Sequence, residues 1–341
     1  MRRLITALDR YWFAPASLRD LALVRILAFG TQTLFFLLFP GGYLRSLPDQ
    51  IHQAQVGTPL YQPIAALKVL LLPWGPWGEV QPSATFLTVT FGVAVVAGVL
   101  ATIGLYARAT MLCAAAANTL LVAHYYSYGE FHHAEALMMI ALNVLAVAPS
   151  TQVWSVDAAR RRRRARGAPS GPSAPADDYE SSVFARWPLR LMQWLLALGY
   201  LSAAGSKLYY GGLGWVNGYT LTYHFLSEAV RSNRETALFL ASLPPWTHIV
   251  PSIFALLFEL TFVVAVLVPR TAWLYVVAGA TFHLAVYATM RFAFFQTIVL
   301  YCVFVESLRL YWPKALRSPL RRSGWARVGA PGRAGNTAGA G

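Results

Sequence analysis

Long apolar runs separated by short polar breaks dominate the hydrophobic pattern of this chain. Eight of the runs approach the roughly 20 residues that an α-helix needs to cross the hydrocarbon core of a bilayer. They are Leu21–Pro40, Ala84–Leu105, Ala109–Tyr125, His133–Pro149, Trp187–Leu208, Ile249–Val268, Ala272–Met290 and Phe294–Trp312. The second and third runs, and the sixth and seventh, are so close together that they predict tight helical hairpins. The pattern therefore predicts an all-α fold, a polytopic membrane bundle of about eight transmembrane helices.

The composition supports a membrane protein rather than a soluble one. Hydrophobic residues make up 57% of the chain and charged residues only 12%, whereas a soluble domain carries roughly 25% charged residues. Cys113 and Cys302 both lie inside apolar runs, which predicts buried free thiols rather than a disulfide framework. Asp9 and Arg10 interrupt the short apolar stretch at the start, so we expect no cleaved signal peptide and a retained first helix.

The distribution of basic residues predicts the orientation of the bundle. If the N-terminus is cytoplasmic, 22 of the 28 Lys and Arg residues fall in cytoplasmic segments. Cytoplasmic loops of membrane proteins carry such an excess of Lys and Arg, so the sequence predicts that both termini are inside. The net charge of +14 then reflects membrane topology, and no nucleic-acid partner is expected.

The polar segments divide the chain into a short cytoplasmic start at 1–20, a transmembrane domain at 21–312 and a basic tail at 313–341. Residues 151–186 interrupt the domain and include the stretch "RRRRRARGAPSGPSAPADDYESS". This composition predicts a disordered cytoplasmic loop, and the tail is predicted to be disordered for the same reason. The arginines serve either as a topology anchor or as a contact for anionic lipid or nucleic acid.

A single lysine stands at the outer end of the fifth run, where a charge near hydrocarbon is costly. Lys207 follows Gly205 and precedes Trp215 and Tyr219. One interpretation is snorkelling, in which the stem lies in lipid and the amine reaches the interface. The other is a buried neutral amine that acts as a general base, with the glycine allowing a ligand to approach closely.

The histidines all fall outside the predicted cytoplasmic segments. His132 and His133 open the fourth run at its outer end, and His283 lies inside the seventh run. An intramembrane histidine is either a structural hydrogen bonder between helices or part of a functional cavity. The spacing does not match the clustered histidine boxes of membrane diiron enzymes, so no metal is expected.

Two glutamates in apolar runs also need partners. Glu259 stands alone in the sixth run, and the sequence does not indicate which group pairs with it. Glu306, near the inner end of the eighth run, is expected to pair with Arg309 three residues later.

Four segments together resemble one known family. "AGSKL" followed by "GWVNGYTL" resembles the catalytic lysine segment of the vitamin K-dependent gamma-carboxylases and their bacterial relatives, the HTTM family. "LRDLALVRI" resembles the arginine signature of that family's first helix. "HHAEALMM", with "VWSVD" downstream, resembles its functional histidine and WSVD-like element, and "ATFHLAVYATMRFAFF" resembles its late histidine segment. The likeness spans roughly Tyr11 to Trp312, and the four segments occur in the family's order.

The resemblance implies a specific chemistry. In the resembled enzymes the lysine deprotonates a reduced naphthoquinone, oxygen adds, and the strong base that forms removes a γ-proton from a glutamate, to which carbon dioxide adds. The histidine of the fourth run stabilises the oxyanion or carbanion, and the late histidine helps to hold the quinone or the intermediate. The residues carried over are Lys207, His133 and, as the alternative alignment, His132 for catalysis, with His283, Trp215, Tyr219 and Gly205 for cofactor binding.

The resemblance also implies cofactors, partners and location. The expected cofactor is a reduced, vitamin K-like naphthoquinone, with O2 and CO2 as co-substrates. The expected partners are membrane lipid, the quinone and a peptide or protein substrate on the outer face, in a multi-pass protein of the cell membrane.

Two departures keep the function open. The eukaryotic enzymes continue into a large lumenal portion, whereas this sequence ends in a basic tail, and Ser206 stands where the family often has a second lysine. The leading hypothesis is oxygen-dependent epoxidation of a reduced quinone, coupled to carboxylation or another deprotonation. The alternatives are a non-catalytic quinone-binding or assembly subunit and a small-molecule transporter, for which no inverted repeat is visible.

Overall fold

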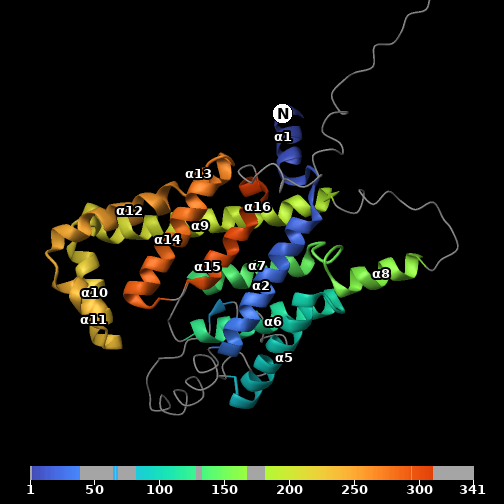
Figure 1. Cartoon of the computed structure of the whole chain (residues 1–341), viewed down its shortest axis with the longest axis horizontal. Coiled ribbons are helices and arrows are strands. Elements are labelled where there is room, and N and C mark those ends of the chain that lie inside the picture. Colours follow the sequence, from blue (N-terminus) through green and yellow to red (C-terminus); the bar gives the residue numbers. More distant parts are fainter. Residues whose placement is uncertain are drawn as a thin grey trace, which may run out of the picture.

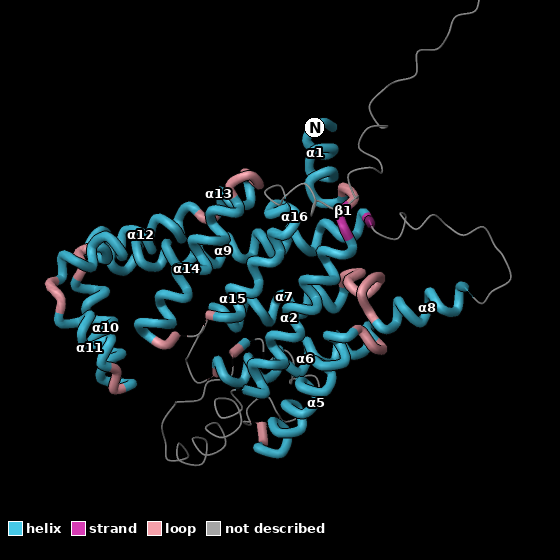
Figure 2. The backbone as a smooth tube through the Cα atoms, in the orientation of Figure 1, coloured by secondary structure: helices cyan, strands magenta, loops and turns pink. Residues whose placement is uncertain are grey.

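The computed structural model describes residues 2–38, 64–65, 67, 82–127, 133–166, 181–292 and 294–309. Over these residues the fold is all-α, apart from one pair of two-residue strands. Figure 1 shows α2, α5, α6 and α7 gathered on one side and α9, α12 and α14 on the other, with α15 between them. Figure 2 shows how completely helices account for the described chain.

Every predicted apolar run coincides with helical structure. The matching elements are α2 (Leu18–Leu38), α5 (Ala84–Ile103), α6 (Ala107–Tyr126), α7 (His133–Val147), α9 (Arg186–Gly211), α12 (Ile249–Thr261) with α13 (Val263–Leu267), α14 (Ala272–Met290), and α15 (Phe295–Leu300) with η7 (Tyr301–Phe304) and α16 (Val305–Leu308). Among the described residues, four helical stretches are long and apolar enough to cross a membrane: Leu18–Leu38, Thr85–Ile103, Pro245–Leu267 and Ala272–Met290. The count of eight spans and their orientation stay predictions.

Helices also form outside the predicted apolar runs. They are α1 (Arg2–Phe13), α8 (Val156–Arg166), α10 (Tyr219–Ser232) and α11 (Glu235–Ser242), with the short turns η4 (Val183–Ala185), η5 (Gly212–Val216) and η6 (Pro245–His248). The prediction of disorder across 151–186 is therefore wrong for α8, whose first turn is capped by the Ser155 hydroxyl, which accepts from the Ala158 amide at 3.0 Å. Residues 167–180 and the tail at 313–341 lie outside the described residues.

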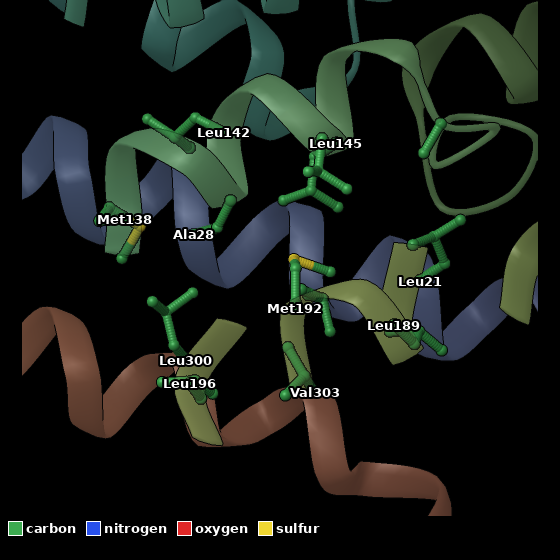
Figure 3. Packing of buried hydrophobic residues seen from close by; sticks show 14 of the residues in the cluster. Leu21, Ala28, Met138, Leu142, Leu145, Leu189, Met192, Leu196, Leu300 and Val303 are labelled. Carbon is green, nitrogen blue, oxygen red and sulfur yellow. The ribbon is translucent and has the colours of Figure 1, made fainter. Parts of the chain in front are cut away.

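The largest buried apolar cluster joins α2, α7, α9 and α15. Figure 3 shows side chains of this cluster from four helices lying near one another, among them Ala28 of α2, Met138 of α7, Leu196 of α9 and Leu300 of α15. At another helix crossing, Gly279 of α14 carries no Cβ, and one added there would lie only 2.7 Å from the Tyr301 ring and 2.9 Å from that of Phe258. Small residues at such crossings let helices approach closely, which in a membrane replaces hydrophobic burial as the source of association.

Arg25 connects α2 to the segment that follows α7. Its guanidinium is fully buried and donates to the carbonyl oxygens of Ser150, at 3.2 Å, and Trp154, at 2.6 Å. Asp157 then accepts from the backbone amides of Tyr106 and Ala107, at 3.2 and 2.8 Å, in the turn between α5 and α6. The "VRI" and "WSVD" segments of the sequence thus meet in one hydrogen-bonded junction.

A second junction ties the two ends of the described chain together. Strand β1 (Ala16–Ser17) pairs with β2 (Ser181–Ser182), and Arg309 forms an ion pair with Asp20. Glu306 pairs with Arg186 at 3.2 Å, so the expectation that Glu306 pairs with Arg309 was wrong. Each arginine reaches a carboxylate or carbonyl that a distant part of the sequence supplies, which local spacing does not reveal.

Candidate functional site

Lys207 and Glu259 form a close ion pair between α9 and α12. The lysine Nζ donates to both carboxylate oxygens, at 2.8 Å to Oε1 and 2.7 Å to Oε2. The lysine side chain is 23% exposed and that of the glutamate 8%. The partner that Glu259 requires is therefore Lys207, and Lys207 packs against the sixth predicted run.

The pair lies near the C-terminal end of α9, in the seam that this helix forms with α12. Tyr200, Ala204 and Lys207 follow one another at i, i+4 and i+7, so they share one face of α9. Deeper in the same seam, the Tyr200 ring lies 5.2 Å from that of Phe258 and 4.5 Å from that of Phe262. The aromatic packing fixes the register of the helices, and that register brings the lysine opposite the glutamate.

An aromatic ring lies against the lysine of the ion pair. The turn η5 places the Trp215 ring with its centroid 5.3 Å from the Lys207 Nζ, within the range of a cation–π contact. A Cβ on Gly211 would lie 3.2 Å from the Cβ of Trp215, so a glycine at this position gives the indole room. A Cβ on Gly205 would meet nothing within 4 Å, so that side of α9 is open.

The positive charge of Lys207 affects the pKa of His224 on α10. The histidine side chain reaches the surface, yet the surrounding protein and then the positive charge of Lys207 lower its pKa below the usual range. The imidazole is thus kept neutral next to the ion pair. Tyr219, the other predicted contact from this region, begins α10 as an exposed residue.

A second polar group lies inside the bundle. His283 of α14 is 4% exposed, and a hydrogen bond of 2.6 Å joins its Nε2 to the Tyr200 hydroxyl, which in turn is hydrogen-bonded to that of Tyr301. The His283 Nδ1 is buried and has no hydrogen-bond partner among the described residues. His283 therefore links three helices, as its structural interpretation predicts, while keeping one nitrogen available.

Of the two fourth-run histidines, the structure describes His133. It is the first residue of α7 and is exposed, whereas His132 lies outside the described residues. Leu137, one turn after His133 on α7, packs near Gly199 of α9, about two turns before Lys207. Within the described ranges, no group of three His, Cys, Asp or Glu side chains could hold a metal ion.

Sequence reasoning missed the two tyrosines that hold His283. The available signal was the spacing of Tyr200 from Lys207, which places both side chains on the same helix face. Tyr301 has no such spacing from a predicted site residue on its own helix, because its hydrogen-bond partner, Tyr200, lies on α9.

The comparison with protein-family models gives a match. The HTTM domain model matches residues 76–307, more than half of the 341-residue chain. The chain belongs to the HTTM family. No curated protein and no solved structure matches it. The match includes Lys207, Glu259 and His283, and it identifies a membrane protein related to the vitamin K-dependent carboxylases.

Proposed function

We propose that this HTTM protein is a multi-pass enzyme of the cell membrane that uses a reduced quinone and oxygen. The reaction is epoxidation of the quinone, coupled to carboxylation by CO2, or to another deprotonation, of a peptide or protein substrate on the outer face. The observation that carries the proposal is the partly open Lys207–Glu259 pair beside Trp215, within the range that the family model matches and in the segment whose sequence resembles the family's lysine segment.

The residues present fit a vitamin K-like naphthoquinone in its reduced form. Such a molecule offers a flat aromatic ring, a hydroxyl and an apolar tail. The site offers the Trp215 ring and an acid–base pair, and the neighbouring Leu213 and Tyr210 are exposed apolar residues at the end of α9. When bound, the quinol supplies the acidic hydroxyl and the electrons that reduce oxygen.

The ion pair gives Lys207 a way to become a base. If the Lys207 ammonium passes one proton to the Glu259 carboxylate, the pair becomes a neutral amine beside a neutral acid, with no net change in charge. The amine Nζ can then accept the proton of a substrate hydroxyl, and the ammonium that forms stabilises the resulting anion. A net-neutral pair suits a poorly hydrated site, because an isolated charge there is costly.

The histidines complete the proposal. His283 contributes its available Nδ1 toward the quinone, while the Tyr200 hydroxyl fixes its ring. His133, or His132 in the alternative alignment, stabilises the anion formed on the substrate. Tyr219 and Gly205 border the quinone at the surface and on the open side of α9.

One observation also supports a second function. The lysine donates to both oxygens of one carboxylate, which is also the geometry of a purely structural ion pair between helices. In that case the protein would be a quinone-binding or assembly subunit that does not turn over.

Comparison of wild type with Lys207→Arg in nanodiscs tests the first function against the second. Arginine keeps the charge and the pair with Glu259, but it does not deprotonate at the pH of the assay. We expect quinone epoxide formation to fall by about 10²-fold or more, as for loss of a general base, while quinone binding persists. Arg231→Lys, in a separate ion pair with Glu228 on α10, is the matched control and should retain activity. Equal rates for wild type and Lys207→Arg would rule out the base.

A further inference from the structure

Helix α10 has an apolar face that no other described element covers. Tyr219, Tyr223, Leu226 and Val230 are all exposed, Val230 to 79%. At about 100° per residue these four positions fall within roughly 60° of the helix circumference. They form one continuous stripe along the helix, which we call the α10 stripe.

The other two faces of α10 differ sharply from the stripe. Phe225, Glu228 and Ala229 are buried, and the Phe225 ring packs 5.2 Å from that of His248 in η6. A third, polar face holds Thr220, His224, Ser227 and Arg231, the last three of them exposed. A helix with separate protein-facing, polar and apolar faces is suited to a boundary between protein, water and hydrocarbon.

The α10 stripe also continues the exposed apolar surface of a candidate membrane span. The stretch Pro245–Leu267 is a candidate membrane span, and its exposed residues Val250, Leu257 and Leu260 lie along one side of α12. Helix α10 contacts η6, the turn at which this span begins. Figure 1 shows α10 at the end of the molecule where α12 begins and α9 ends.

We propose that α10 lies in the membrane interface, with the stripe sunk among the lipid acyl chains on the side where α9 ends. An apolar helix face of this kind enters the headgroup–acyl boundary by about 5–10 Å. Tyrosines at 219 and 223 suit this depth, since their rings prefer the headgroup level. Segment 219–232 is thus part of the membrane-embedded surface rather than a loop in water, and this holds whether or not the protein turns over a quinone.

Fluorescence quenching in nanodiscs tests this placement. In a Cys113→Ala, Cys302→Ala background, an environment-sensitive fluorophore is attached to Val230→Cys on the stripe or to Ser227→Cys on the polar face. A lipid with a nitroxide near its headgroup should quench the label at 230 more strongly than aqueous iodide does. The label at 227, one turn away on the same exposed helix, should show the reverse order.

Two results would overturn the proposal. Equal access of iodide to both labels would place the stripe in water. A label at 230 that neither quencher reaches would show that protein covers the stripe, either a second copy or another part of this chain. Tyr223→Cys repeats the measurement on the stripe, and size-exclusion profiles matching the background protein establish that each variant is folded.

Discussion

At the scale of single residues, the pairing of Lys207 with Glu259 changes what the lysine can do. A snorkelling lysine needs only an aqueous interface, but this one has a carboxylate at 2.7 Å and an indole above it. The sequence identified both ionisable residues and the need of each for a partner. It did not pair them, because two residues on separate apolar helices carry no local pattern that joins them. The same limit explains the wrong partner for Glu306, where a neighbour at i+3 was available but Arg186 was closer in space.

The charge on Lys207 should be measurable through its effect on the pKa of His224. Since that charge and the surrounding protein both lower the pKa of His224, the unfolded chain binds more protons than the folded one just below the usual histidine pKa. His224 therefore opposes folding increasingly as the pH falls through this window. In Lys207→Met the pKa of His224 should rise, yet stay below its usual value because the effect of burial remains.

The modification of His224 by diethyl pyrocarbonate, followed by peptide mass spectrometry across pH, measures this shift. The reagent attacks neutral imidazole, so the midpoint of modification reports the pKa. His133, also exposed, serves as the internal control and should not change. An unchanged midpoint at His224 in Lys207→Met would contradict a charged Lys207 at rest.

At the scale of elements, run length and apolar content predicted the helices well, because a segment buried in hydrocarbon must satisfy its backbone internally. They did not predict where a helix is interrupted. Spans six and eight change geometry at Phe262 and at Tyr301–Phe304, where packing against neighbouring helices decides the local structure. They also missed α10, whose signal was the spacing of 219, 223, 226 and 230 in the stretch between the fifth and sixth predicted runs.

The junction at Arg25 gives an element-scale prediction. Gly104, between α5 and α6, has a φ of +71°, and a Cβ there would collide with the Ser155 side chain and lie 2.9 Å from the Arg25 Nη1. Gly104→Ala should therefore destabilise the protein by about 1–3 kcal/mol, through both backbone strain and disruption of the junction.

Gly92→Ala is the matched control for this substitution. Gly92 lies inside α5, and a Cβ there meets nothing within 4 Å. Because alanine favours helix by about 0.5–1 kcal/mol over glycine, Gly92→Ala should be neutral or stabilising. The fraction of monodisperse protein after heating in detergent ranks the two variants, and Gly104→Ala matching Gly92→Ala would show that the junction tolerates a side chain.

At the scale of the whole molecule, the part of the chain up to α8 and the part from β2 onward are held together by direct contacts between their helices and strands. Helix α2 packs on α15 and η7, α7 packs on α9 and α15, and β1 pairs with β2. We therefore expect that the chain can be divided between residues 172 and 173 and still assemble when both parts are co-expressed. Affinity purification of a tagged first part should recover the second.

Weakening the shared end should reduce that recovery. Asp20→Asn removes the charge that pairs with Arg309, and Arg186→Gln removes the donor to Glu306 and to the Ala14 carbonyl. Two parts that both reach the membrane but fail to co-purify, even without these substitutions, would contradict the picture of one continuous bundle.

The pairing of Asp20 with Arg309 has a consequence for the order of events during synthesis. Roughly 290 residues separate the two partners, and a ribosome adds about 5–20 residues per second. The carboxylate at the start of α2 therefore waits about 15–60 s for the arginine that neutralises it. Helix α2 is therefore made early, but the Asp20 side chain gains its ion-pair partner only after the last described helix has been synthesised.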